Sequence, residues 1–175
     1  IKDAHDQGLS IYFIHGNRDF LLGSQFEKNT GLKIINDMTV IKDSGISLMI
    51  AHGDSFCIDD VEYQALKKSL RSEEWKKDFL QKPIAERIAF ADDLRAKSAE
   101  SSSNKAENIM DVNQSYVAEV IEKHKIDFLI HGHTHRPAIH KLDNGSSRVV
   151  LGSWEDKGWV AAVSYTHLTL PTIGE

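Results

Sequence analysis

The stretch Asp127-Phe128-Leu129-Ile130-His131-Gly132-His133-Thr134-His135 places a Gly-His-x-His motif directly after an apolar run. The same layout occurs twice earlier: Gly16-Asn17-Arg18-Asp19 follows residues 11–14, and His52-Gly53-Asp54 follows residues 46–51. Residues just past the ends of strands converge at one edge of a sheet, so distant segments can offer Asn oxygen and His nitrogen to one ion. The pattern predicts an α/β fold with a metal site at that edge.

Size and composition fit one ordinary domain with a real core. The chain has 175 residues, of which 41% are hydrophobic and 27% charged. The single cysteine, Cys57, excludes an internal disulfide framework and suits a reducing compartment, most simply the cytoplasm. No apolar run approaches the roughly 20 residues of a membrane-spanning helix, so we expect any membrane contact to be peripheral.

Short apolar runs alternate with turn signals, and a long helix-rich segment separates two sets of predicted strands. That segment covers residues 60–90 with an interruption at Pro83, and the serine-rich residues 99–104 predict a loop. Further helices are expected at 20–30 and 107–124. The predicted strands are residues 10–15, 33–35, 39–41, 46–51, 127–131, 136–142, 148–151 and 159–163, with turns at 43–45 and 143–145.

Each motif is weak alone, since Asn-Arg-Asp and His-Gly-Asp also occur in turns and a lone His is commonly a hydrogen-bonding residue. Their common context makes the combination specific. Two imidazoles two residues apart suit two neighbouring ions better than one closed tetrahedral site. Mixed oxygen and nitrogen donors, with Cys57 outside the set, favour Mn²⁺ or a similar ion over structural zinc.

The order Gly-Asn-x-Asp, His-Gly-Asp, Gly-His-x-His resembles the later motifs of the calcineurin-like metallophosphoesterases. Residues 12–22, 109–114 and 130–137 resemble more narrowly a bacterial branch of that superfamily that acts in lipid A biosynthesis. The resemblance runs to about Val163. It implies a metallophosphoesterase-type sandwich of β-sheets flanked by helices, with a helical lid insertion at about residues 60–107.

The family's metal ligands carry over to four positions. By resemblance, Asn17, His52 and His133 would bind one Mn²⁺ and His135 the other. The superfamily's two earlier motifs, Asp-x-His and Gly-Asp, are absent; Asp3-Ala4-His5 fits the letters of the first, but no apolar strand precedes it. We therefore expect that the first strands are missing, that four of seven ligands are present, and that this piece binds metal weakly and is inactive by itself.

The resemblance implies hydrolysis of the diphosphate bond of UDP-2,3-diacylglucosamine to UMP and 2,3-diacylglucosamine 1-phosphate. Phosphoryl transfer at two metal ions depends on positioning and charge stabilisation. Arg18 stands where many relatives carry His, and it suits a phosphate leaving group, which needs charge stabilisation rather than a proton. Arg18 and His133 are thus the predicted catalytic residues. The alternative for Arg18 is an ion pair with Asp19.

Further substrate contacts are implied by the resemblance. Ser102 stands where we expect a family Asn, so a shorter hydroxyl or a bridging water would make that contact. The predicted substrate-binding residues are Asn17, Arg18, Asp60, Ser98, Ser102, Lys105 and His133. Beside the metal, Asp54 is expected to orient either the loop or a ligand imidazole by accepting a hydrogen bond, while His15 and His131 are expected to be structural.

The helix-rich segment has two features with two interpretations each. Residues 67–97 hold nine Lys or Arg against six acids in a chain of net charge −5. Charge alone favours a solvated helix, whereas the resemblance favours contact with an anionic membrane surface at the cytoplasmic face of the inner membrane. The apolar stripe of Trp75, Phe79, Ile84 and Ile88 is either a packed face or the wall of a lid for two acyl chains, and the resemblance favours the lid.

Two other functions stay open. One is a metallophosphoesterase for soluble nucleotides or phosphodiesters, and the other is a degenerate, non-catalytic interaction domain. No nucleic-acid partner is expected. Residues 164–175 depart from the family pattern, which ends in another strand, and we interpret them as a non-native extension.

Overall fold

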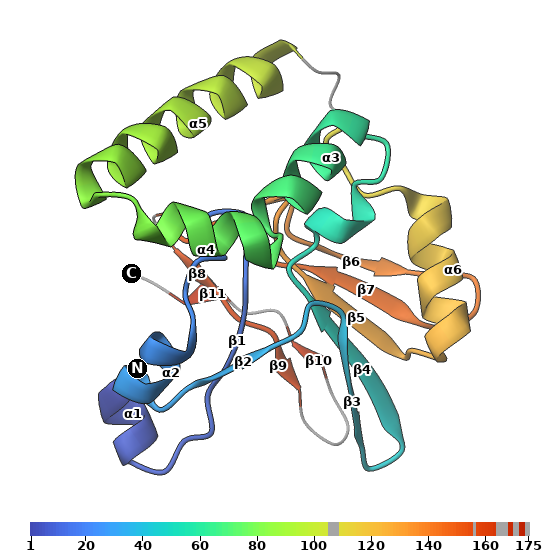
Figure 1. The fold of residues 1–175 in the computed structure, drawn as a ribbon. Helices are drawn as coiled ribbons and strands as arrows, with labels where there is room; N and C mark the ends of the chain where they lie inside the picture. The colour runs from blue at the N-terminus through green and yellow to red at the C-terminus, as the bar shows by residue number, and fades with distance from the viewer. Residues whose placement is uncertain (105–108, 156, 164–167, 170–171, 174–175) are drawn as a thin grey trace. The chain divides into compact units, whose positions relative to one another are not determined.

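The computed structural model describes residues 1–104, 109–155, 157–163, 168–169 and 172–173, without the side chains of 99, 101–104, 168–169 and 172–173. The chain forms two compact units (Figure 1). The first comprises Ile1–Phe56 and Gln114–Glu175, and the second is Cys57–Asn113. All three motifs belong to the first unit.

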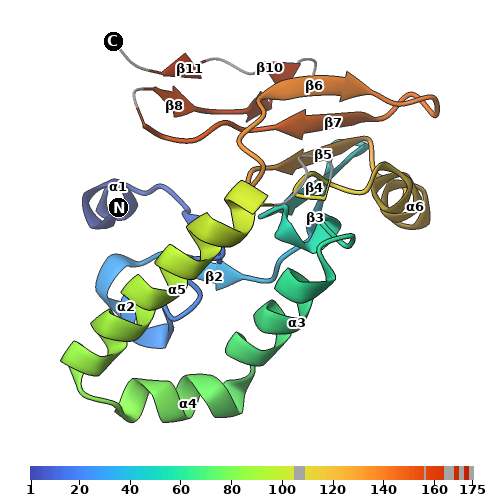
Figure 2. The ribbon, with the colours of Figure 1, turned by 90° about the horizontal axis from the view of Figure 1, so that it is seen from above.

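A five-stranded mixed sheet forms the centre of the first unit, in the order β3-β4-β5-β7-β6, which can be followed in Figure 2. Its central strands β4 (Ile46–Ala51), β5 (Phe128–His131) and β7 (Ser147–Val150) are parallel neighbours. The edge strands β3 (Thr39–Asp43) and β6 (Ala138–Lys141) pair antiparallel to β4 and β7. The predicted α/β class is confirmed.

Burial explains why the central strands read as nearly continuous apolar runs. A parallel strand is covered on both faces, so neither face needs polar side chains. Met49, Leu129 and Val149 are fully buried. The helix α6 (Gln114–His124) leads into β5 and lies alongside the sheet in both views, contributing buried Val117 and Ile121 (Figures 1 and 2).

The chain before β3 forms a smaller substructure of the same unit. The strand β1 (Tyr12–Ile14) pairs in parallel with β2 (Lys33–Ile35), and the helices are α1 (Lys2–Asp6) and α2 (Ser24–Thr30). Gly31 ends α2 with a left-handed φ of 76°, which glycine adopts at low cost. The helix predicted at residues 20–30 ends where expected but starts later, at Ser24.

The second unit is helical and contains α3 (Val61–Leu70), α4 (Glu73–Gln81) and α5 (Ile84–Asn104). Asp60 caps α3, and its carboxylate accepts a hydrogen bond from the Tyr63 N–H at 3.1 Å. The interruption predicted at Pro83 is confirmed: Lys82 is extended, with ψ of 151°, because a residue before proline avoids the helical region.

Three sequence-based boundaries were wrong. Residues 99–104 are not a loop, since α5 continues to Asn104 on the helix propagated from the preceding turns. The helix expected at 107–124 begins at Gln114, after residues 109–113 in turns and irregular backbone. The strand expected at 159–163 is two short strands, β8 (Gly158–Trp159) and β9 (Ala162–Val163).

The C-terminal region pairs with itself in two short antiparallel ladders. β10 (Leu168–Thr169) pairs with β9, and β11 (Thr172–Ile173) pairs with β8. The interpretation of residues 164–175 as a non-native extension stays a prediction.

Candidate metal centre

The carboxyl ends of β4 and β5 bring two of the predicted ligands together. Ala51 and His131 are paired in the parallel ladder, so the turns that follow each strand begin side by side. The ring centroids of His52 and His133 lie 4.9 Å apart, with the planes at 59°. Residues 81 positions apart in sequence (133 − 52) thus face each other at one sheet edge, as the motif layout predicts.

The buried carboxylate of Asp54 lies against the far side of the His52 ring. Nδ1 of His52 is 3.1 Å from Oδ1 of Asp54, whose side chain is fully buried. His52 Nδ1 makes no hydrogen bond in the described structure, so the contact is electrostatic and the expected hydrogen bond to Asp54 is not formed. It leaves Nε2 as the ring nitrogen directed away from Asp54, which is the arrangement that a carboxylate–histidine–metal triad requires.

Asp37 holds the His52 turn in place and was not identified from the sequence. Its carboxylate accepts one hydrogen bond from the backbone N–H of His52 at 2.8 Å and another from the Ser55 hydroxyl at 2.5 Å. In the sequence, Asp37 lies between β2 and β3 and outside all three motifs. An Asn-Asp pair there indicates a turn, and nothing in the local pattern indicates that its carboxylate reaches a neighbouring strand end.

The Asn17 turn lies against His52. A β-carbon placed on Gly16 would come within 3.1 Å of His52 Nε2, so a side chain there would crowd the His52 ring. The turn is closed by Asp19, whose carboxylate accepts a hydrogen bond from the Gly16 N–H at 2.6 Å. Among the described residues Arg18 makes no ion pair with Asp19, and Asn17 and Arg18 are both exposed.

Both histidines of the Gly-His-x-His motif have left-handed backbone. The φ angles are 66° at His133 and 53° at His135, a region that costs a non-glycine residue about 1–3 kcal/mol. The His133 ring faces His52, whereas no hydrogen bond, ion pair or ring contact joins the exposed His135 to the other predicted ligands within the described residues. Strain of this kind persists only where the surroundings hold it, and it is common at functional sites.

The donors present fit a divalent ion in kind. His52 and His133 offer imidazole nitrogens, and Asn17 follows the glycine that touches His52. In the part of the chain that the structure describes, no three His, Cys, Asp or Glu side chains gather closely enough to hold an ion. The cluster is therefore an imidazole pair beside the turn that carries Asn17, to which oxygen ligands would have to be added.

The remaining predicted substrate contacts belong to the second unit. Asp60 is the N-cap of α3 and Ser98 is exposed on α5. Ser102 lies in α5, but its side chain is outside the description, and Lys105 is outside the described residues altogether. The roles of these four residues stay predictions.

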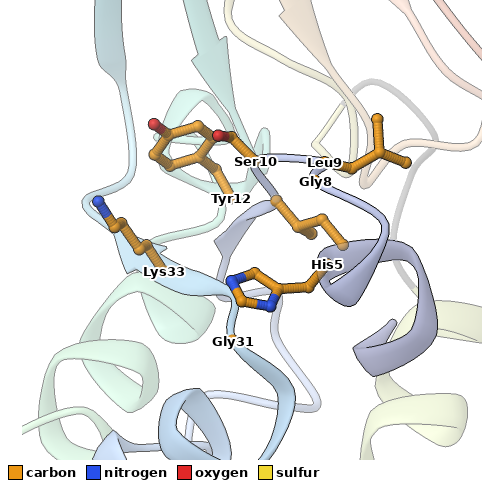
Figure 3. A pocket seen from close by; sticks show the side chains of 8 residues that line it. His5, Gly8, Leu9, Ser10, Tyr12, Gly31 and Lys33 are labelled. Atoms are coloured by element: carbon orange, nitrogen blue, oxygen red, sulfur yellow. The ribbon is translucent and has the colours of Figure 1, made fainter.

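A hollow of about 240 Å³ lies at the other end of β1 from Asn17 (Figure 3). His5 lines it with Tyr12 and Lys33, and the His5 ring extends from α1 to cover Gly31, where a β-carbon would meet it at 2.4 Å. His5 thus packs on a helix-capping glycine. Asp3-Ala4-His5 lies in a helix and not after a strand, as expected for a chance match to the ligand motif.

The fold and the histidine pair agree with the family assignment. The model of the calcineurin-like phosphoesterase family matches residues 2–137, so the chain belongs to that family. Membership in this metallophosphoesterase family implies divalent metal ions, which agrees with the metal site predicted from the sequence.

Similarity to individual relatives narrows the assignment to one branch of the family. The chain is 42% identical over 173 residues to a UDP-2,3-diacylglucosamine hydrolase of Escherichia fergusonii, a match that covers 97% of this chain and 72% of that protein. It is 41% identical, with the same coverage, to a UDP-2,3-diacylglucosamine hydrolase of Cellvibrio japonicus. The resemblance to that branch of the family is confirmed.

Proposed function

We propose that this chain carries active-site residues of a UDP-2,3-diacylglucosamine hydrolase, which cleaves the diphosphate to UMP and 2,3-diacylglucosamine 1-phosphate. The observation that carries the proposal is the His52–His133 pair at the ends of two parallel strands. Identity of 42% over nearly the whole chain to relatives of that name supports the substrate.

Asn17, His52, His133 and His135 would hold the metal, for which we propose two Mn²⁺ ions. When bound, such ions supply Lewis acidity and charge neutralisation at the phosphoryl oxygens. Asp54 fixes the orientation of His52, and Asp37 fixes the turn that carries it. Arg18, exposed and without an ion pair to Asp19 in the described structure, is available to stabilise the charge on the leaving phosphate.

The helical unit offers surface for acyl chains. Trp75 and Phe79 stack at 4.5 Å, and Phe90 of α5 closes the cluster at 5.1 Å from Phe79. These rings are therefore mainly packing within the unit. Ile84 and Ile88 differ, because they are 65% and 57% exposed one turn apart on α5. We assign them, and not Trp75 or Phe79, as the lipid-facing part of the stripe.

The Lys- and Arg-rich residues 67–97 support membrane contact less than the exposed isoleucines do. Lys76, Arg95 and Lys97 each lie within 4.0 Å of an acid one turn away on the same helix, and Lys82, just before α5, lies 3.7 Å from Glu86 in the first turn of that helix. Such pairs are typical of a solvated helix. No described helix is long and apolar enough to cross a bilayer. The proposed peripheral position at the cytoplasmic face of the inner membrane rests on the lipid substrate.

The test uses the protein as its gene encodes it, supplied with Mn²⁺ and the diacyl substrate. UMP should be released, and His133→Ala and Arg18→Ala should each reduce turnover at least a hundredfold without changing the circular dichroism spectrum. A soluble UDP-sugar and a phosphodiester serve as comparison substrates. Equal turnover of these would favour a general phosphoesterase, and no turnover of any would favour a non-catalytic domain; both results contradict the proposal.

A further inference from the structure

Two polar side chains are buried beside the histidine turns without being ligands. His131, the last residue of β5, is 1% exposed, and Arg148 of β7 is 3% exposed. Nη1 of Arg148 lies 3.2 Å from Nε2 of His131. In the parallel ladder Arg148 pairs with Leu129, so its side chain reaches His131 diagonally on the same face of the sheet.

The partners of His131 determine where its ring proton lies. Nε2 faces a guanidinium, which can only donate, and Nδ1 lies 2.9 Å from the Gly132 carbonyl oxygen, which can only accept. Nε2 must therefore be the acceptor and Nδ1 must carry the hydrogen. A ring protonated on both nitrogens would set an N–H against the guanidinium N–H. One arrangement alone satisfies both contacts, the neutral Nδ1–H tautomer.

The same carbonyl begins the turn that carries His133. The Thr134 N–H donates to the Gly132 oxygen at 2.8 Å, a bond between residues i and i+2 that defines a γ-turn centred on His133. With φ of 66° at its central residue, this is the rarer and more strained form of γ-turn. The Gly132 oxygen thus accepts from both sides, from the His131 ring and from the Thr134 backbone.

We propose that Arg148 is a positioning residue, which holds His131 in the Nδ1–H tautomer so that the Gly132 carbonyl stays in place and the His133 turn keeps its strained shape. The guanidinium acts through His131 and the Gly132 carbonyl and does not need to touch metal or substrate. This inference rests on the proposed function for its effect on catalysis. The tautomer itself does not depend on that function.

The primary test is nitrogen-15 NMR of the imidazoles in the full chain at neutral pH, without metal or substrate. His131 should show a protonated Nδ1 and an unprotonated Nε2. In Arg148→Met nothing opposes a proton on Nε2, so the Nε2–H form should become populated beside the Nδ1–H form, and the His133 backbone resonances should shift. Wild-type protein with a protonated Nε2, or an Arg148→Met protein with unchanged His131 and His133 signals, would overturn the inference.

A matched variant separates positioning from general stability. Val149 is fully buried on the same strand but faces the other side of the sheet, so Val149→Ala should lower stability and leave the His131 tautomer unchanged. Arg148→Lys keeps a donor and should retain part of the wild-type His131 signal, which also covers the case in which Arg148→Met does not fold. A His131 tautomer that changes equally in Val149→Ala would contradict a specific role of Arg148.

The catalytic consequence is measured separately in the metal-loaded protein as its gene encodes it. Changes in groups that orient a metal-binding histidine typically cost 10–100-fold in activity or affinity. Arg148→Met should therefore lower kcat by about that factor with little change in KM. A tautomer shift with unchanged kcat would overturn the positioning role, whereas an inactive wild-type enzyme would count against the proposed function and leave the tautomer result standing.

Discussion

The backbone N–H of Gly132 donates a hydrogen bond of 2.9 Å to the carbonyl oxygen of His52. This bond extends the β4–β5 ladder by one step, into the two turns that carry the facing histidines. The turns therefore form one hydrogen-bonded unit, and a change in the backbone of one is transmitted to the other.

Gly53→Ala should be one of the most damaging small substitutions in the molecule. Gly53 has φ of 119°, and a β-carbon would lie 2.8 Å from both the Gly132 oxygen and His131 Nδ1. The control is Gly45→Ala, because Gly45 has φ of 83° but open space around it. We expect Gly45→Ala to cost about 1 kcal/mol and Gly53→Ala at least about 3 kcal/mol in urea unfolding. Equal losses would mean that backbone conformation, and not the crowded turn, dominates at Gly53.

Asp37→Asn should destabilise the His52 turn. The carboxylate accepts from the His52 N–H and the Ser55 hydroxyl, and an amide would turn one acceptor into a donor facing a donor. We expect the free energy of unfolding to fall by about 1–3 kcal/mol. Asp43→Asn, on the exposed β3–β4 turn, should change it by less than about 0.5 kcal/mol. A similarly small effect at Asp37 would show that the turn does not depend on this carboxylate.

Asp54→Asn should weaken metal binding more than it weakens the fold. Asp54 is the charged neighbour of the His52 ring, at 3.1 Å, and removing its charge reduces the basicity of the opposite nitrogen. Titration calorimetry with Mn²⁺ should show affinity reduced about 10–100-fold. Asp59→Asn, at an exposed aspartate that bonds Asn113 in the helical unit, is the charge-matched control. Unchanged affinity in Asp54→Asn would remove Asp54 from the metal centre.

The double variant Ile84→Ser with Ile88→Ser should separate lipid binding from packing. Both side chains are exposed, so their loss should leave unfolding nearly unchanged. Phe79 is 6% exposed, and Phe79→Ala should cost about 3–5 kcal/mol. In the protein as its gene encodes it, the Ile84/Ile88 variant should lose at least tenfold in kcat/KM for the diacyl substrate and nothing for a soluble UDP-sugar. Equal losses on both substrates would exclude a lipid-specific role.

The sequence predicted the central sheet and its histidine pair well, because both follow from local patterns. Apolar runs followed by polar motifs marked β4 and β5, and the rule that parallel strands end at one edge placed His52 beside His133. The turn at Asp43-Ser44-Gly45 was equally local, and both Ser44 and Gly45 have positive φ.

What the sequence did not reveal are contacts made across strands. Arg148 reads as an ordinary position in a short strand, and only the register of β5 with β7 brings it to His131. Asp37 likewise acts on a turn 15 residues away. The error at residues 99–104 has another cause: serine disfavours a helix only weakly, and an established helix can extend through such residues.

The chain leaves the sheet unit for the helical unit and returns to it at neighbouring points. Phe56, its last preceding residue, and Tyr116, just beyond it, have ring centroids 6.3 Å apart. Closing a loop of doubled length between such fixed ends costs only about 0.6 kcal/mol more. The helical segment Cys57–Asn113 can therefore be lengthened, shortened or replaced during evolution with little change in the free energy of folding. Substrate range can then diverge while the residues at the strand ends stay the same.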